Sequence, residues 1–331
     1  MKLLDYWGNP IRKDAFIIRA TEFGQFVNCP RSWAFGTHNG LNLEPVQTSP
    51  KLRFGTIWHE GMEAIYDPNN PKDPFTAISD CFAQERQVFE DTLGVEAHDP
   101  ELVQQLNEEE ELATKLMTSY ESWRTSLAEP SDLELNFQSA EHRYVIPLEG
   151  TNAYIAVKFD AEVLDKHDGF WIMEHKTRGK SSDVGNPPEL ELDFQMGIQL
   201  LVASYVRDNV RGVLYNLARK QPPGPRVKKD IFGRHKAQRT PYMLQYLESY
   251  VLEIYREMRQ ASNIIKGDDW DYGLRRLRYN PQPMGFCRWG CPVKEICESI
   301  NRGEDYEYLI NEKLTPRSKN IWETLEEELQ E

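Results

Sequence analysis

The chain has 331 residues, 28% of them charged and 40% hydrophobic, and carries a formal net charge of −14. That acidity argues against a general nucleic-acid binder, and no apolar run approaches the ~18 residues of a membrane helix. The first residues also lack the apolar stretch of a signal peptide, so we expect a cytoplasmic protein that does not contact a membrane. Thiols stay reduced in that compartment, so its five cysteines are expected to be ligands or core residues.

The first 130 residues are predicted to be mainly helical. Residues 1–20 suit an extended arm, and Thr21 is expected to cap a helix that Pro30 bends directly after Cys29. Further predicted helices are one starting at Phe54 and two charged ones over 75–93 and 100–128.

The pattern then changes to alternating segments rich in β-branched and aromatic residues, separated by short turns. They predict an antiparallel meander of three strands, 135–148, 152–165 and 170–177. The following elements are expected to be a helix (190–209), a strand (211–220), a basic proline-rich flap (221–240) and a helix (241–266). Such an order predicts one α/β domain, a mixed β-sheet flanked by helices with a helical insert at 70–130.

Two carboxylates are expected to meet at one end of this sheet, because Asp160 and Glu174 fall on neighbouring strands. Carboxylate oxygens suit Mg²⁺ or Mn²⁺. Lys176 shares the face of Glu174, since strand side chains repeat every two residues, whereas the side chain of His175 lies opposite. His59 is a further candidate ligand, for a second position that prefers Mn²⁺. The alternative is a surface ion-pair ladder, but a buried strand would then end in an unpaired charge.

This arrangement resembles the PD-(D/E)XK nuclease superfamily, with its restriction-endonuclease-like core, and in particular its RecB-like branch. The matching segments are FGTIWHEG, VKFDAEV and WIMEHKTRG. The resemblance implies that His59, Asp160, Glu174 and the backbone carbonyl of His175 bind metal, and that Lys176 assists catalysis.

The same family carries a Q-x-x-x-Y helix after the E-x-K strand, which contacts DNA and supports the lysine. Gln195 matches its glutamine and is assigned to the catalytic set. Position 199 is Gln rather than Tyr, and Tyr205 does not have the family spacing, so the role of the tyrosine stays open.

Four cysteines form a second pattern, one early and three late: Cys29, Cys287, Cys291 and Cys297. Four thiolates suit an iron–sulfur cluster or a structural zinc, although the C-x-x-C pairs of zinc ribbons are missing. Four reduced core thiols are the remaining alternative. Cys81 lies outside the pattern and is expected to be a buried helix residue.

One early and three late cysteines also resemble the iron–sulfur members of the RecB-like branch, which include CRISPR-associated protein 4, AddB-type nucleases and phage-type exonucleases. This resemblance implies a [4Fe-4S] cluster that clasps the two ends of the domain. The first late spacing, with three residues between Cys287 and Cys291, departs from the two that are usual there.

Basic residues concentrate between Arg207 and Arg239, with ten Lys and Arg against two acids. A polyanion could bind there although the chain is acidic. Predicted DNA contacts are Arg178, Lys180, Lys220, Arg226, Lys228 and Lys229, with Arg234 and Lys236 on the same flap. Aromatic side chains that could stack on unpaired bases are Trp33, Phe35, Trp58 and Tyr154.

We therefore expect a single nuclease domain over 1–331, divided into N-terminal helices (21–66), the insert (70–130), a catalytic core (133–220), a cysteine-rich clasp (268–301) and an acidic tail (302–331). The predicted activity is metal-dependent exonuclease cleavage of DNA ends, single-stranded or frayed, with 5′-to-3′ polarity, in phage or bacterial recombination. The alternative is a non-catalytic module that binds DNA ends and hands them to a recombination or CRISPR-adaptation protein. The sequence leaves open whether the protein forms a homo-oligomer.

Overall fold

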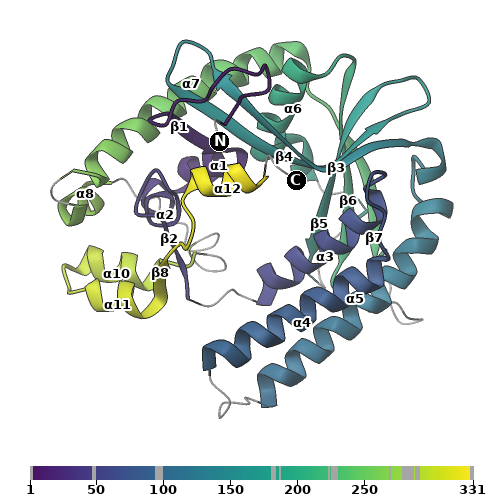
Figure 1. Cartoon of the computed structure of the whole chain (residues 1–331), viewed down its shortest axis with the longest axis horizontal. Helices are drawn as coiled ribbons and strands as arrows, with labels where there is room; N and C mark the ends of the chain where they lie inside the picture. The colour runs from purple at the N-terminus through teal and green to yellow at the C-terminus, as the bar shows by residue number, and fades with distance from the viewer. Residues whose placement is uncertain are drawn as a thin grey trace.

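A six-stranded mixed sheet forms the centre of the computed structural model (Figure 1). The structure describes residues 3–46, 50–93, 100–179, 184–185, 188–222, 224, 230–267, 270–277, 287 and 291–328. Its sheet strands are β1 (Phe16–Arg19), β3 (Asn136–Leu148), β4 (Ala153–Leu164), β5 (Phe170–Arg178), β6 (Val210–Arg219) and β7 (Phe232–Ala237). The predicted mixed α/β class is confirmed, as is the antiparallel meander, which is β3–β4–β5.

Strand β4 has an unusual edge, because two different strands share it. β1 pairs in parallel with residues 153–156 of β4, and β5 pairs antiparallel with residues 161–164. β3 runs along the other edge for the whole length of β4. Between the two shorter ladders, β5 diverges from β4 and continues beside β6, which leaves room for side chains at the point of divergence.

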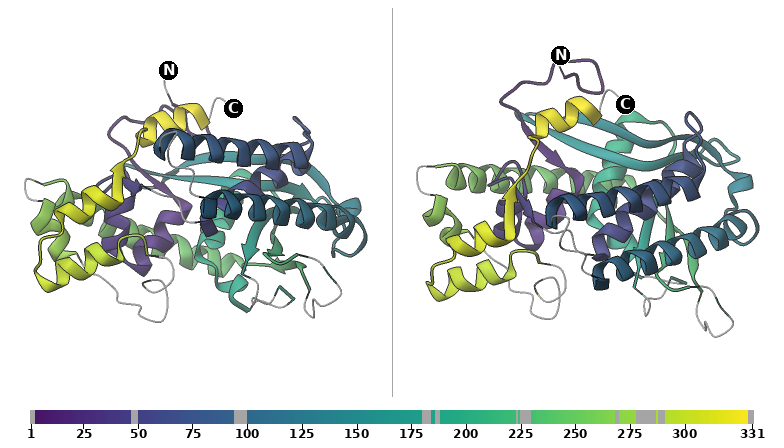
Figure 2. Two further views of the ribbon diagram at one scale, coloured as in Figure 1. Left: turned by 90° about the horizontal axis from the view of Figure 1, so that it is seen from below. Right: turned by 60° about the horizontal axis from the view of Figure 1, so that its bottom comes forward.

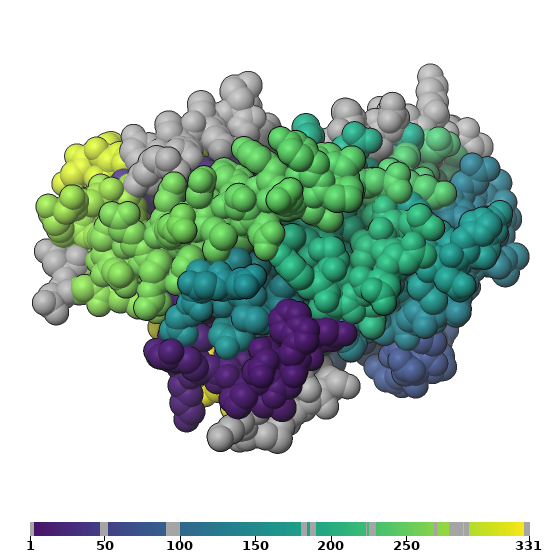
Figure 3. Space-filling model, turned by 90° about the horizontal axis from the view of Figure 1, so that it is seen from above, coloured from purple at the N-terminus to yellow at the C-terminus, as the bar shows by residue number. Residues whose placement is uncertain are grey.

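Helices cover both faces of the sheet (Figures 1 and 2). On one face the core is formed with α1 (Ala20–Asn28), α6 (Phe194–Val206) and α7 (Pro241–Ile265). Figure 3 shows α7 crossing the molecule on this side. The other face carries α3 (Pro50–Tyr66), α4 (Pro74–Leu93) and α5 (Pro100–Ser126), so the predicted insert is a helical hairpin that builds a second core.

The C-terminal elements return to the N-terminal helices. They are α8 (Trp270–Arg276), α10 (Lys294–Arg302), α11 (Glu307–Lys313), β8 (Leu314–Pro316) and α12 (Ile321–Glu328). β8 pairs antiparallel with β2 (Leu43–Pro45), and α10 and α11 lie beside α2 (Pro30–Gly36) in Figure 1. Two 3₁₀ turns complete the elements, η1 (Asp132–Glu134) and η2 (Pro188–Leu192).

Several local predictions were wrong. The expected arm contains β1, and the expected flap contains β7; both are short strands whose pairing depends on a distant partner. Thr21 does not cap the first helix, which begins at Ala20 after Arg19 without a side-chain cap. Cys81 is half-buried on α4. No helix within the described residues is both long and apolar enough to cross a membrane.

Candidate active site

The divergence of β4 and β5 places Asp160 against the backbone of the neighbouring strand. Its Oδ2 accepts a hydrogen bond from the backbone N–H of His175 at 2.8 Å, although no ladder pair joins the strands at this level. The carboxylate thus takes the place of a strand partner and is held at the opening. Only 7% of Asp160 and 4% of Glu174 are exposed, so the two acids lie almost fully inside the protein.

Lys176 is held between two carboxylates. Its Nζ lies 2.7 Å from Oδ2 of Asp193 and 3.7 Å from Oε1 of Glu174, and it sits over the ring of Tyr215 at 5.5 Å. Asp193 is also the N-cap of α6, where its Oδ1 accepts from the N–H of Met196. Asp193 was not among the predicted site residues, although an acid directly before an apolar helix is an N-cap signal.

His59 and Glu141 complete the group around Asp160. His59 extends from α3, and its Nδ1 lies 3.4 Å from Oδ2 of Asp160. Glu141 lies on β3 directly opposite Asp160, because its neighbours Ala140 and His142 pair with the residues on either side of Asp160. Within the described part of the chain, His59, Glu141 and Asp160 form the one group of three or more His, Cys, Asp or Glu side chains close enough to hold a metal ion.

Burial of these acids shapes their protonation. Burial, followed by the charge of Glu141, raises the pKa of Asp160 to about 7. Burial and the charge of Asp160 raise the pKa of Glu174 to about 8, against the opposing effect of Lys176. For Lys176, burial acts to lower the pKa, but Glu174 and Asp193 outweigh it and hold the ammonium charged.

The buried acids fit a divalent cation. Oε2 of Glu174 is buried without a hydrogen-bond partner in the described structure, and a buried carboxylate in that condition is costly unless it is neutralised. Asp160, Glu174 and His59 offer the oxygen and imidazole ligands that Mg²⁺ and Mn²⁺ accept. The backbone carbonyl of His175 stays a predicted ligand.

Helix α6 brings two glutamines next to Asp160. Gln195 and Gln199 line a small cavity of about 250 Å³ together with Asp160 and Lys158. Gln199 is buried, and its Nε2 donates to the carbonyl of Lys158 at 3.2 Å, so it ties α6 to β4. Tyr205 points elsewhere and bonds to Glu248. The ring under Lys176 belongs to Tyr215 on β6, a residue that the sequence analysis did not single out.

The side chain of His175 lies on the face opposite Glu174, as expected. It is 2% exposed, stacks on Tyr66 at 5.1 Å between ring centroids, and lies 3.4 Å from Nδ2 of Asn216. Burial lowers its pKa well below the ordinary value. The imidazole therefore packs as a neutral ring behind the site and fixes the strand that carries Glu174 and Lys176.

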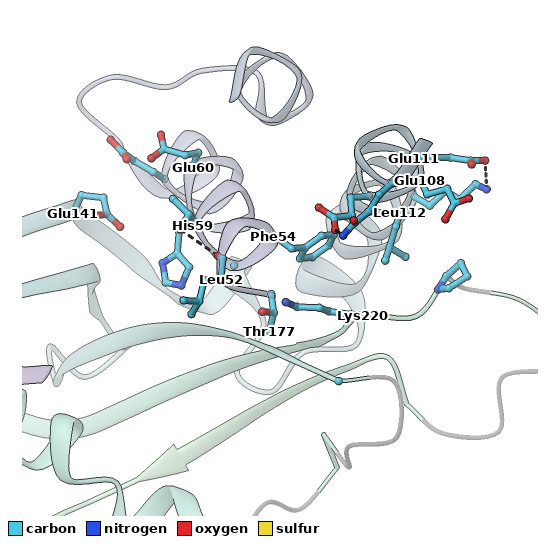
Figure 4. Close-up of a pocket in the computed structure, with 18 of the residues that line it drawn as sticks. Leu52, Phe54, His59, Glu60, Glu108, Glu111, Leu112, Glu141, Thr177 and Lys220 are labelled. Atoms are coloured by element: carbon cyan, nitrogen blue, oxygen red, sulfur yellow. Dashed lines mark hydrogen bonds and ion pairs between the residues drawn. The ribbon is translucent and has the colours of Figure 1, made fainter. Parts of the chain in front are cut away.

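A cleft of about 1050 Å³ opens beside the group, between α3 and α5 (Figure 4). Lys220 lies on its floor with Nζ 4.9 Å above the ring of Phe54, and its backbone N–H bonds to the carbonyl of Arg178 at the end of β5. The two predicted DNA contacts are thus neighbours in the sheet, although Thr177 and Gly179, rather than Arg178, line the cleft with Lys220. The other four, Lys180, Arg226, Lys228 and Lys229, lie outside the described residues.

Some predicted nucleic-acid contacts are wrong. Arg234 is buried on β7 and pairs with Asp132 at 2.7 Å, because the flap segment folds back as a strand over the second core. Lys236 is exposed and sits over the ring of Trp171, so its contact with DNA stays a prediction. Trp33, Trp58 and Phe35 are each at most 1% exposed, so they belong to the core and cannot stack on bases. Tyr154 is half-buried in a cluster that includes residues of α12.

The early and late cysteines lie in neighbouring elements. Cys29 precedes α2, and Cys297 lies on α10. Arg31, which is 3% exposed, donates to Sγ of Cys297 at 3.3 Å and to Asn301 at 2.7 Å. Burial raises the pKa of Cys291 to about 11, with smaller contributions from the thiols of Cys287, Cys29 and Cys297. No three described cysteines lie close enough to share a single ion.

Comparison with known proteins identifies the class of this fold and site. The model of the PD-(D/E)XK nuclease superfamily matches residues 20–298, which span every residue of the site. The chain belongs to this superfamily. It is therefore a nuclease, a hydrolase of the nucleic-acid backbone whose relatives use divalent metals and act on DNA.

Individual proteins add little to this assignment. No curated protein matches the chain significantly. Among solved structures, the crystal structure of SSO0001 is similar over 87% of this chain and 88% of that chain, with 13% sequence identity and a TM-score of 0.31.

Proposed function

We propose that this nuclease is a 5′-to-3′ exonuclease that hydrolyses DNA ends at the site formed by His59, Asp160, Glu174 and Lys176, with a structural [4Fe-4S] cluster. Its role would be the processing of DNA ends in phage or bacterial recombination. The observation that carries the proposal is the convergence of the two buried acids and the lysine where β5 leaves β4.

Each residue has a distinct task in this proposal. Asp160 and Glu174, with His59 and the His175 carbonyl, would hold a divalent cation, which lowers the pKa of a coordinated water and acts as a Lewis acid. Asp193 and Glu174 keep the ammonium of Lys176 charged and aimed at the opening, where it can orient the attacking water and offset charge on the phosphate. Gln195, on α6, would contact the DNA strand.

The charge of the cleft supports cleavage at ends. Its lining contains six glutamates (Glu60, Glu63, Glu108, Glu109, Glu111 and Glu141) and three lysines (Lys115, Lys158 and Lys220). A DNA strand that continued through this cleft would bring its phosphates close to an excess of carboxylates. A DNA strand that enters beside Arg178 and Lys220, and whose end lies at Asp160 and Glu174, would avoid that repulsion.

The positions of the thiols suit a clasp between the two ends of the domain. Cys29 precedes α2 and Cys297 lies on α10, and Arg31 of α2 donates to the sulfur of Cys297. Four thiolates are the ligands of a [4Fe-4S] cluster, which would join α2 to α10. Such a clasp transfers no electrons in hydrolysis; it would hold the N-terminal helices against the C-terminal segment.

Substrates with and without ends test the activity. With Mn²⁺ or Mg²⁺, we expect degradation of linear single-stranded and frayed DNA, no cleavage of closed circles, and resistance of strands blocked at the 5′ end. Lys176→Ala should abolish cleavage and Lys319→Ala, which removes an exposed lysine, should not. Rapid cleavage of circles would contradict the exonuclease mode; binding without cleavage by the wild type would indicate the end-binding module instead.

Metal content tests the clasp separately. Protein purified without oxygen should contain about four irons and four sulfides per chain, and Cys297→Ser should lose them. One zinc per chain, or no bound metal, would contradict the cluster while leaving the nuclease assignment intact.

A further inference from the structure

A row of polar side chains crosses three strands of the sheet behind the proposed active site. His175 on β5, Asn216 on β6 and Arg234 on β7 are paired neighbours in the two ladders, and each is at most 8% exposed. The row faces α3 and α5, which cover this side of the sheet (Figure 1). Buried polar side chains are costly unless they are satisfied, so three in one row point to a task beyond packing.

The hydrogen bonds of this row fix the orientation of each member. Arg234 has only donors to offer, and its Nε donates to Oδ1 of Asn216 at 2.6 Å. The amide of Asn216 therefore turns its Nδ2 toward His175, where Nδ1 lies at 3.4 Å and accepts. Since Nε2 of His175 has no hydrogen-bond partner among the described residues, the orientation of this ring depends on Asn216.

A buried ion pair anchors the far end of the row. Nη1 of Arg234 lies 2.7 Å from Oδ1 of Asp132, and the other oxygen of Asp132 accepts from the hydroxyl of Tyr66 at 2.9 Å. Asn216 also donates to the hydroxyl of Tyr120 at 2.9 Å. Because Tyr66 belongs to α3 and Tyr120 to α5, the row is tied to both helices that cover it.

At the near end, the ring of His175 lies between β5 and α3. It stacks on Tyr66 with 5.1 Å between ring centroids and meets the ring of His59 edge-on at 6.1 Å. Tyr66 and His59 are about two turns apart on α3, so the imidazole contacts this helix at two points. The backbone N–H of His175 holds Asp160, which lies 3.4 Å from His59. The ring therefore sets the spacing between two proposed cation ligands.

Strand β5 needs this support at the level of the site. Its ladder with β4 ends at Met173, so the segment from Glu174 to Lys176 has a ladder with β6 alone. One edge of the segment thus lacks the regular backbone hydrogen bonds that fix a strand inside a sheet. The polar row supplies a second attachment, from the side chain of His175 to β6 and β7.

We propose that Asn216 and Arg234 are positioning residues for the nuclease reaction. Through His175 they hold β5 against α3, and so keep His59 and Asp160 at the separation that a divalent cation requires. They contact neither the cation nor DNA. Because the cation ligands are those of the proposed function, this positioning role rests on that function.

Calorimetric titration of the full-length protein with Mn²⁺, without DNA, tests this role. Asn216→Leu removes the hydrogen bond to His175 and leaves every cation ligand in place. The folded variant should bind Mn²⁺ about 10- to 100-fold more weakly than wild type, as when a residue that orients a metal ligand is lost. Cleavage of linear DNA should need correspondingly more Mn²⁺, while the rate at saturating Mn²⁺ should stay close to that of wild type.

A matched control separates positioning from stability. Glu162 is also buried and hydrogen-bonded, but its partners include Tyr144 and Arg207 and lie outside the row. Glu162→Gln should therefore make unfolding in urea easier without changing the Mn²⁺ affinity of the folded protein. If Asn216 stabilised the fold and did nothing else, the two variants would behave alike.

His175→Phe is the second variant, and it decides the question if Asn216→Leu does not fold. It keeps a ring against Tyr66 but has no atom that accepts from Asn216, so it should weaken Mn²⁺ binding to a similar degree. The double variant should bind Mn²⁺ no more weakly than Asn216→Leu alone, since both changes remove the same hydrogen bond.

Wild-type affinity for Mn²⁺ in His175→Phe or in folded Asn216→Leu would overturn the positioning role, as would an equal loss of affinity in Glu162→Gln. A failure of the proposed function gives a different result. Wild type would then bind Mn²⁺ but leave DNA ends intact, and the weaker binding of the variants would still support the row. Degradation of 5′ ends by wild type, with unchanged Mn²⁺ binding in both variants, would keep the exonuclease and remove the positioning role.

Discussion

Asp160 and Glu162 are two residues apart on β4 and both are buried, with 7% and 1% of their surface exposed, yet their hydrogen-bond partners differ. Glu162 accepts from the hydroxyls of Tyr144 and Ser139, both at 2.6 Å, and pairs with Arg207 at 2.9 Å. Burial alone would raise its pKa, but Arg207 and these hydroxyls outweigh burial and lower it. Asp160 has one backbone N–H and an imidazole nearby, and its pKa is raised to about 7.

The contrast separates a structural acid from a functional one. A buried carboxylate with its full set of donors needs nothing further and stabilises the fold that surrounds it. A buried carboxylate that lacks hydrogen-bond donors can be neutralised by binding a cation. Without the cation, the unpaired charge lowers the stability of the fold. Three substitutions and a change of pH test this difference between the two acids.

The largest effect is expected at Asp160. Asp160→Asn removes a cation ligand but leaves the shape of the side chain, so cleavage of linear DNA should fall by about 10³-fold or more. The fold should persist, because the uncharged amide suits a buried position. Rates in Mn²⁺, together with circular dichroism, measure both. A variant with near-normal activity would remove Asp160 from the site.

At Glu162 we expect a loss of stability with little loss of activity, the opposite of the result at Asp160. Glu162→Gln removes the charge that pairs with the half-exposed Arg207 and weakens the hydrogen bonds from Tyr144 and Ser139, so unfolding in urea should be easier by about 2 kcal/mol. Since Glu162 does not face the opening, the rate per folded molecule should stay near that of wild type. A large loss of activity with unchanged stability would contradict the division between the two acids.

The raised pKa values of Asp160 and Glu174, about 7 and 8, make the metal-free protein sensitive to pH. A group whose pKa rises on folding contributes stability below its unfolded value, near 4, and loses that contribution as pH rises through its folded value. Between pH 5 and 8 the metal-free protein should therefore lose stability, at up to about 1.4 kcal/mol per pH unit for each of the two groups.

Thermal unfolding at several pH values measures that loss. The decline should be much smaller in an Asp160→Asn, Glu174→Gln double variant, and saturating Mn²⁺ should reverse it in wild type because the cation binds the ionised acids. Equal pH dependence of the two proteins would show that other groups are responsible.

The smallest effect is expected at Tyr144. Tyr144→Phe removes one of the donors to Glu162 and keeps the ring, which should cost about 1 kcal/mol of stability. Urea unfolding would detect the change. Because Arg207 and Ser139 remain, a loss as large as that of Glu162→Gln would mean that the hydroxyl, rather than the arginine, holds the acid.

Strong local patterns predicted much of the fold. The alternation of 135–177 predicted β3, β4 and β5, and the helical periodicity of 241–266 predicted α7 closely. The short strands were not predicted. β1 and β7 have four and six residues, and each forms by pairing with a distant strand, β4 and β6 respectively. The basic residues around β7 were misassigned for the same reason, since Arg234 is buried once its segment becomes a strand.

The residue types of the site could be read from the sequence: an acid, an acid-x-lysine on the next strand, a helix histidine, and cysteines placed early and late. The hydrogen-bond and ion-pair partners of these side chains depend on the tertiary structure. It gave Lys176 the carboxylate of Asp193, placed Glu141 opposite Asp160, and supplied Glu162 with the donors that Asp160 lacks. These relations join residues far apart in the chain, and local periodicity carries no information on where a diverging strand opens the sheet.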